Sequence, residues 1–269
     1  MQVAVSTSHR IHLSAEQAVC ESYPLGFTDI QLGTPHYSVN IEALNILREK
    51  LGLTYTVHAP FPAARGFIAN SAAKDEETFL KSKDIFLKSI DNAKSIGAEI
   101  VVVHSAEPGP DNNLESTLKM ISSLADRGEA NGQIICVENK MPNSSVGYSP
   151  KDMQAILEDV GSENVGICFD TGHAIASLGS ERKALEFMSS FAKWIRDVHI
   201  VPGTYEWDVA TPPQMEPQFY RGVVKILDQA GYCGNLTIET VPEISDSEII
   251  RGAQYLRATI AEYYEGQIL

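Results

Sequence analysis

EIVVVHS, residues 99–105, is the stretch that decides the fold of this chain. It is a short run of apolar and β-branched residues, typical of a strand buried on both faces, and it ends in a residue that can bind a metal. The same arrangement recurs five times: TYTVHAP (54–60), QIICVEN (133–139), VGICFDTGH (165–173), IRDVHIV (195–201) and GNLTIET (234–240). The residues at the ends of the six runs are His58, His104, Glu138, Asp170, His199 and Glu239.

The segments between these runs have the apolar spacing of amphipathic helices. In NIEALNILREKL (40–51), residues Ile41, Leu44, Leu47 and Leu51 fall on one face at spacings of three and four. Similar segments cover 14–22, 74–96, 113–130, 149–160, 180–192, 217–231 and 245–264. Two earlier strand candidates, VAVST and FTDIQLG, cover 3–7 and 27–33. Eight strands alternating with eight helices predict an α/β fold, a (β/α)8 TIM barrel that forms a single domain over 1–269.

The alternative to the barrel is a doubly wound open sheet. Such a sheet commonly carries a glycine-rich phosphate loop after its first strand. Here the turn reads STSHRIHL (6–13) and contains no glycine. The number of strands and this turn therefore favour the closed barrel.

In a parallel barrel, the carboxyl ends of all strands open onto one mouth, where active sites of this fold lie. A charge at a buried strand end is costly unless it is paired or binds a metal. The three carboxylates of Glu138, Asp170 and Glu239 occupy the same position in their strands as three histidines, and such a set is hard to explain by structural roles alone. Oxygen and nitrogen donors suit Zn²⁺, Mn²⁺, Fe²⁺ or Co²⁺, and the absence of cysteine from the set argues against a closed structural zinc site.

Composition narrows the classes of function. The chain has 269 residues and a formal net charge of -14, which disfavours nucleic acid as a partner. The four cysteines are scattered without a CxxC pair, as expected of a cytoplasmic protein with reduced thiols. We find neither a leader sequence nor a run long enough to span a membrane. The oligomeric state stays open, with a homodimer as one expected assembly.

Residues beyond the strand ends are candidates for binding a substrate. His173 follows Asp170 in DTGH, where Gly172 predicts a tight loop, and its imidazole is a candidate ligand of a metal or a substrate. Arg65 lies in the loop after the third strand, and Trp207 in the loop PGTYEWDVATPPQ after the seventh. The alternative role for Arg65 is that of a solvated loop residue, and for Trp207 that of a hydrophobic side chain packed inward.

The strings HAPF, VVVHSAEPG, CVENK, FDTGHA, DVHI and TIET resemble the xylose-isomerase-like TIM barrels, which include sugar isomerases and epimerases and endonuclease IV. The resemblance covers the chain from its third to its eighth strand. In the epimerase branch, one divalent ion is held by a Glu, an Asp, a His and a Glu. These residues match Glu138, Asp170, His199 and Glu239, and in that branch the two glutamates also transfer protons.

The endonuclease IV branch implies more metal ions. Its additional histidines match His58 and His104, and its third zinc is held by the histidine of a DTxH motif and by an Asp-x-His. The first of these matches His173 and the aspartate matches Asp208, but Ala210 stands where the second histidine belongs. The third zinc site is therefore incomplete in this sequence.

Isomerisation fits this site better than phosphodiester cleavage. One divalent ion can polarise a sugar carbonyl while a carboxylate removes the neighbouring proton, whereas DNA cleavage requires several metals and a positive surface. We therefore expect a sugar isomerase or epimerase with one divalent ion, Mn²⁺, Zn²⁺, Co²⁺ or Mg²⁺, and a small sugar as substrate. Two alternatives remain. One is an endonuclease IV-like phosphodiesterase with a second ion at His58 and His104, and the other is a barrel that binds without catalysis.

Overall fold

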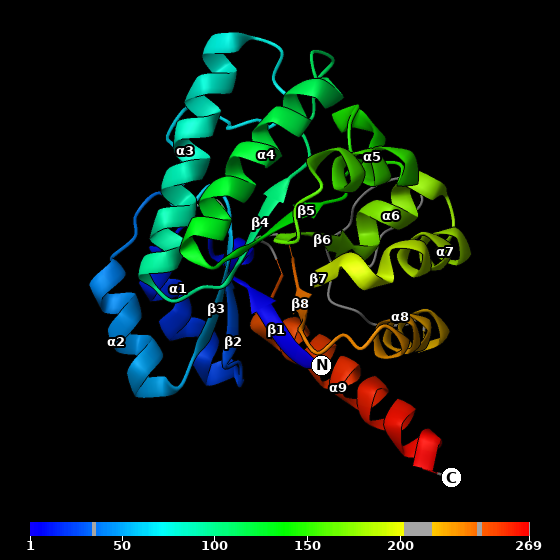
Figure 1. Ribbon diagram of the computed structural model, residues 1–269. Helices are drawn as coiled ribbons and strands as arrows, with labels where there is room; N and C mark the ends of the chain where they lie inside the picture. The colour runs from blue at the N-terminus through cyan, green and yellow to red at the C-terminus, as the bar shows by residue number, and fades with distance from the viewer. Residues whose placement is uncertain (34–35, 202–216, 241–243, 269) are drawn as a thin grey trace.

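In the computed structural model, which describes residues 1–33, 36–201, 217–240 and 244–268, eight parallel strands pair in chain order and β8 closes a barrel against β1 (Figure 1). The strands are β1 (Gln2–Ser6), β2 (Asp29–Leu32), β3 (Thr54–His58), β4 (Ile100–His104), β5 (Ile134–Glu138), β6 (Val165–Asp170), β7 (Ile195–Ile200) and β8 (Asn235–Ile238). The prediction of a TIM barrel is confirmed.

Helices surround the barrel on its outer side (Figure 1). They are α1 (Ala15–Ser22), α2 (Ile41–Leu51), α3 (Glu76–Ser95), α4 (Leu114–Asn131), α5 (Pro150–Val160), α6 (Thr171–Leu178), α7 (Glu181–Phe191), α8 (Pro217–Gln229) and α9 (Asp246–Ile268). Short 3-10 helices add η1 (Thr7–Arg10), η2 (Tyr23–Leu25), η3 (Pro142–Ser144) and η4 (Ala192–Trp194). Within the described part of the chain, no helix combines the length and apolarity that crossing a bilayer requires.

Local signals in the sequence start most helices where they were expected. Ser14 and Gln17 form the capping box of α1, and Ser149 caps α5 with Pro150 in its first turn. Helix α6 was not predicted, because DTGH was interpreted as a tight loop. The side chain of Asp170 instead caps α6 by accepting a hydrogen bond from the backbone N–H of His173 at 2.6 Å. A capping carboxylate at the strand end starts the helix at once and leaves Gly172 inside its first turn.

Strand register places the candidate ligands beside one another. His104 pairs with Glu138 across β4 and β5, and Asp170 pairs with His199 across β6 and β7. The second pairing depends on a one-residue shift in β7, where Ile195 pairs with Ile167 but Asp197 pairs with Cys168. Such a bulge inserts one residue into a strand and reorients the side chains after it.

Gly166 allows the two strands to approach closely at this bulge. A Cβ atom at Gly166 would lie 2.8 Å from the backbone oxygen of Trp194 and 2.6 Å from Cγ of Arg196. Backbone atoms cannot move aside as a flexible side chain can. The small residue in β6 is therefore part of what sets the position of His199.

A side-chain bridge joins the ends of β5 and β6. The Asn139 amide donates to the backbone oxygen of Asp170 at 3.0 Å, and the backbone N–H of Asp170 donates to Oδ1 of Asn139 at 2.8 Å. Asn139 is buried, so both hydrogen bonds are shielded from water. The bridge holds Glu138 and Asp170 at a fixed separation.

We predict that Asn139→Ala lowers the free energy of unfolding by about 2–4 kcal/mol, because two buried hydrogen bonds are lost and their backbone partners are left unsatisfied. Urea denaturation of the full chain measures the change. Asn45→Ala is the control, since the Asn45 amide makes one exposed hydrogen bond to Ser95, and we expect about 0.5 kcal/mol or less there. Equal stability of the two variants would contradict the role of the bridge.

Candidate metal centre

Four side chains from successive strand ends converge at the mouth of the barrel. Glu138 and Asp170 end β5 and β6, His199 is the last residue but one of β7, and Glu239 directly follows β8. Each offers one ligand atom, and all four atoms lie within 4.8 Å of one another. The structure thus brings together the four residues that the resemblance assigns to a single ion.

Glu138, like His199, has no exposed surface. Its Oε2 lies 2.9 Å from Nε2 of His58 and 3.3 Å from Nε2 of His104, and its Oε1 lies 3.0 Å from Nδ1 of His173. Burial opposes ionisation of this carboxyl. Nearby Lys140 and His104 outweigh burial and hold the pKa of Glu138 well below its usual range.

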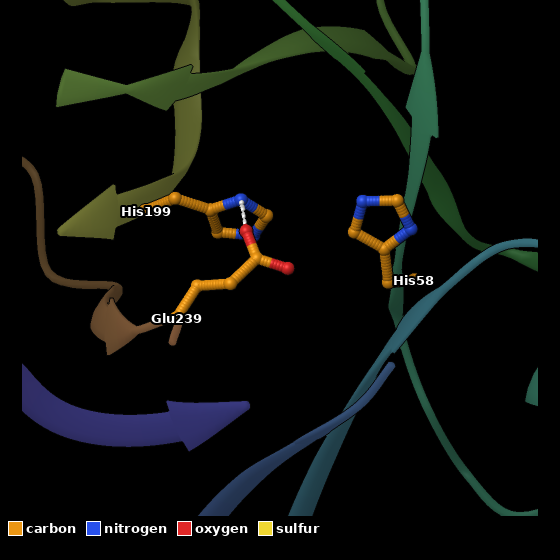
Figure 2. A group of neighbouring side chains, drawn as sticks. All are labelled: His58, His199 and Glu239. Carbon is orange, nitrogen blue, oxygen red and sulfur yellow. Dashed lines mark ion pairs between the residues drawn. The ribbon is translucent and has the colours of Figure 1, made fainter. Parts of the chain in front are cut away.

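Glu239 and His199 form the second half of the site. Nδ1 of His199 lies 2.9 Å from Oε2 of Glu239 and 3.8 Å from carboxylate oxygens of Glu138 and Asp170. Figure 2 shows the Glu239 carboxylate against the His199 ring, with His58 facing them from the other side of the mouth. The side chain of Glu239 keeps 22% of its surface exposed, so it is the more accessible of the two glutamates.

Burial and neighbouring charges act in opposite directions on this pair. Desolvation raises the pKa of Glu239, but the adjacent His199 outweighs it and lowers this pKa to about 2. Desolvation likewise disfavours a charged His199, but Cys168 and Glu239 raise the pKa of the imidazole well above its usual range. The carboxylate is therefore held in its charged, ligand-competent form.

The chemistry of this group fits a divalent cation. Both ring nitrogens of His199 are buried and make no hydrogen bond of acceptable geometry, although three carboxylates surround the ring. A buried polar atom without such a bond is costly unless something else satisfies it. Three carboxylates and one imidazole are donors that Zn²⁺, Mn²⁺, Co²⁺ and Mg²⁺ accept in different proportions. These four residues could hold such an ion.

Three further groups of ligand atoms share members with this one. His58, His104 and Glu138 form the first, and their ligand atoms also lie within 4.8 Å of one another. His58, His199 and Glu239, drawn in Figure 2, form the second. His173 joins the first group through its contact with Glu138, and its Nδ1 also lies 2.9 Å from the backbone oxygen of Asn139. The structure thus brings His58, His104 and His173 to the mouth, as predicted from their positions.

The third group, Cys168, Asp197 and His199, lies deeper in the barrel. Asp197 accepts hydrogen bonds from Gln31 and Thr237 at 3.0 and 3.3 Å and from the backbone of Val198. Burial raises the pKa of Asp197 to about 6. Because its oxygens are already bonded within the barrel, we interpret Asp197 as a structural acid beneath His199.

Two charged residues at the mouth, Lys140 and Glu107, were not predicted from the sequence. Nζ of Lys140 lies 3.2 Å from Nε2 of His104, and Oε1 of Glu107 lies 2.5 Å from its Nδ1. Lys140 follows Glu138 by two residues, a spacing that keeps side chains on one side of an extended chain. That spacing could have identified it.

Other predicted site residues lie farther out or outside the described residues. Arg65 is exposed, and its guanidinium lies 5.0 Å from the centre of the Tyr37 ring. Its role in binding a substrate stays a prediction. Trp207 and Asp208 lie outside the described residues, so their predicted roles stay predictions too.

We predict that Asp170→Asn weakens binding of Mn²⁺ by at least about tenfold, because an amide replaces an anionic ligand while keeping the oxygen that caps α6. Calorimetric titration of chelator-treated protein measures the affinity. Asp159→Asn, an exposed substitution on α5, should bind as the natural chain does. An Asp170→Asn variant with undiminished affinity would remove Asp170 from the ligand set.

Comparisons with known proteins agree with this fold. An uncharacterised protein of Methanocaldococcus jannaschii is 28% identical over 84% of this chain and 75% of its own length. A probable endonuclease 4 of Carboxydothermus hydrogenoformans is 27% identical over 52% of this chain, which spans only 48% of that relative.

Solved structures resemble nearly the whole chain. A D-tagatose 3-epimerase-like protein superposes with a TM-score of 0.81 at 23% identity, over 98% of this chain and 97% of its own. A D-psicose 3-epimerase from Clostridium cellulolyticum H10 has a TM-score of 0.77 at 15% identity, over 97% and 99%. At such identities these similarities show the fold alone. The family model described as xylose isomerase-like TIM barrel matches residues 22–259, and the chain belongs to that family.

Proposed function

We propose that this protein is a divalent-metal-dependent epimerase or isomerase of a small sugar. The observation that carries the proposal is the convergence of Glu138, Asp170, His199 and Glu239, with ligand atoms within 4.8 Å of one another. Epimerases of sugars such as D-psicose are among the proteins of similar fold. A polar, uncharged sugar also suits a chain with a net charge of -14, which repels polyanions.

The four residues would hold the ion through three carboxylates and the Nδ1 atom of His199, the nitrogen that faces Glu239. Bound there, a divalent ion would polarise the substrate carbonyl and stabilise the negative charge that develops beside it. The ring of His199 is fully buried, so it cannot turn away to solvent. The chain would thus fix the position of the bound ion before a substrate arrives.

Glu239 and Glu138 are the groups that would move the proton. One carboxylate takes the proton from the carbon next to the carbonyl, and the electron pair of that C–H bond passes into the enediolate. A carboxylic acid then returns a proton to carbon, from the other side in an epimerase. The two glutamates come from β5 and β8, three strands apart, so they approach a bound substrate from different directions.

Glu239 is the better placed of the two to act as the base. It is partly exposed, and the short contact that the structure gives its carboxylate is the one to His199. Glu138 has no exposed surface and lies within about 3 Å of both His58 and His173. Glu138 would therefore need to be released from these contacts before it exchanged a proton with substrate.

Phosphodiester cleavage of the endonuclease IV type is the rival activity. The His58, His104 and Glu138 group favours it, because these residues offer the ligands for a second ion. The acidic chain and the incomplete third site, where Ala210 stands in place of a histidine, disfavour it. The short match to endonuclease 4 leaves this activity a proposal of lower rank.

We predict that the metal-loaded protein, incubated with ketoses in D₂O, incorporates deuterium at the carbon beside the carbonyl as the epimer forms. Nuclear magnetic resonance spectroscopy of the sugars follows both changes. Glu239→Gln should lower the rate by at least about 10²-fold, because it removes a general base. Glu138→Gln should leave the fold intact and abolish turnover.

Glu265→Gln, which changes an exposed residue near the end of α9, is the matched control and should retain full activity. A fully active Glu138→Gln variant would overturn the assignment of the proton-transfer pair. If abasic DNA is nicked at low salt while no ketose is turned over, the phosphodiesterase replaces the epimerase. If neither reaction occurs with the ion bound, the alternative of a barrel that binds without catalysis gains support.

A further inference from the structure

Lys140 is held in a nearly enclosed position beside the metal centre. Its side chain is 10% exposed, and its Nζ lies 3.2 Å from Nε2 of His104 and 3.7 Å from Oε1 of Glu138. Hydrogen bonds on both sides of its backbone fix the residue, since its N–H donates to Gly147 and its carbonyl accepts from the Ser177 hydroxyl. A buried ammonium in this position requires a function or a compensating charge.

The same corner of the mouth offers a second set of metal ligands. Nε2 of His58 and Nε2 of His104 lie 2.9 and 3.3 Å from one oxygen of Glu138, the carboxylate shared with the first site. Judged by donor types alone, His58, His104 and Glu138 would hold a second ion next to the first. The position of Lys140 decides whether they do.

The contacts of His104 show which position Lys140 occupies. Its Nζ lies 3.2 Å from Nε2 of His104, so the ammonium stands at the ring nitrogen that faces Glu138. Oε1 of Glu107 lies 2.5 Å from the other ring nitrogen, Nδ1, and holds the ring in this orientation. A metal ion shared by His104 and Glu138 would need the space at this same nitrogen.

The positive charge of Lys140 also opposes binding of a second ion. An imidazole nitrogen binds zinc at about 2.1 Å, so any ion on Nε2 of His104 would lie within about 5 Å of the Lys140 ammonium. The repulsion between the ion and the ammonium would be screened less than between two surface charges, because Lys140, His58 and Glu138 are buried. The lysine supplies one positive charge where a second ion would supply two.

We propose that the Lys140 ammonium takes the place of a second metal ion, so that this barrel binds one divalent ion per chain, at Glu138, Asp170, His199 and Glu239. The inference rests on the proposed function for that first ion. Lys140 also leaves a fixed positive charge beside the ion, with donors to offer to a substrate oxygen. The position of Lys140 explains why His58 and His104, which match a multinuclear metal site, are present in a protein that we propose binds one ion.

The test is the number of Mn²⁺ ions bound by the chelator-treated full chain, measured by equilibrium dialysis, with electron paramagnetic resonance of the bound ions. We expect about one ion per natural chain, with the spectrum of an isolated Mn²⁺. Lys140→Met removes the charge and keeps the bulk, and it should bind about two ions whose spectra show spin coupling. Adding His104→Ala to Lys140→Met should return the count to one.

Two controls separate charge from other effects of substitution. Lys140→Arg keeps a donor-only cation and should stay at one ion, and Lys88→Met, which changes an exposed lysine on α3, should do the same. Circular dichroism checks folding, and Lys140→Gln replaces Lys140→Met if the latter does not fold.

Two coupled ions in the natural chain, or one ion in a folded Lys140→Met or Lys140→Gln variant, would overturn the inference. A natural chain that binds two ions and still epimerises sugars would refute the role of Lys140 but not the proposed function. A natural chain that binds no ion would refute the proposed function itself.

Discussion

The rest of the site is arranged around the carboxylate of Glu138, which has lost all contact with solvent. Removing a charge from water costs several kcal/mol, and the protein offsets that cost with imidazoles and an ammonium. His58, His104 and His173 come from three different elements, β3, β4 and α6, so the balance of charge also ties those elements together. The same carboxylate belongs to two of the three groups of candidate ligands that meet at the mouth. Its surroundings therefore determine how much positive charge the site accepts.

Much of this architecture could be predicted from the sequence because buried parallel strands leave a strong signal. The runs that end at His104, Glu138 and Asp170 are continuous apolar segments, and a closed barrel brings their ends to one mouth whatever the lengths of the intervening helices. The expectation that these strand ends meet at one mouth followed from topology. Side-chain contacts were not needed for it.

The parts that were missed depend on contacts that topology does not specify. Lys140 and Glu107 lie in loops, and although its spacing from Glu138 points to Lys140, the contacts of both residues with opposite nitrogens of His104 are visible only in the structure. Helix α6 was missed because Gly172 suggested a turn, whereas Asp170 caps a helix that begins directly at the end of the strand. Roles of Trp207 and Asp208 stay predictions, since both lie outside the described residues.

The register shift in β7 has a consequence for how such a site can change over evolutionary time. Side chains alternate between the lumen and the helical layer, and Arg196 is the residue at which β7 changes from one alternation to the other. A regular register that paired Arg196 with Cys168 would set Val198 opposite Asp170 and turn the imidazole of His199 away from the lumen. A mutation that straightened this bulge could thus remove a candidate metal ligand from the mouth without altering the order of any strand, so that barrels with the same topology can differ abruptly in chemistry.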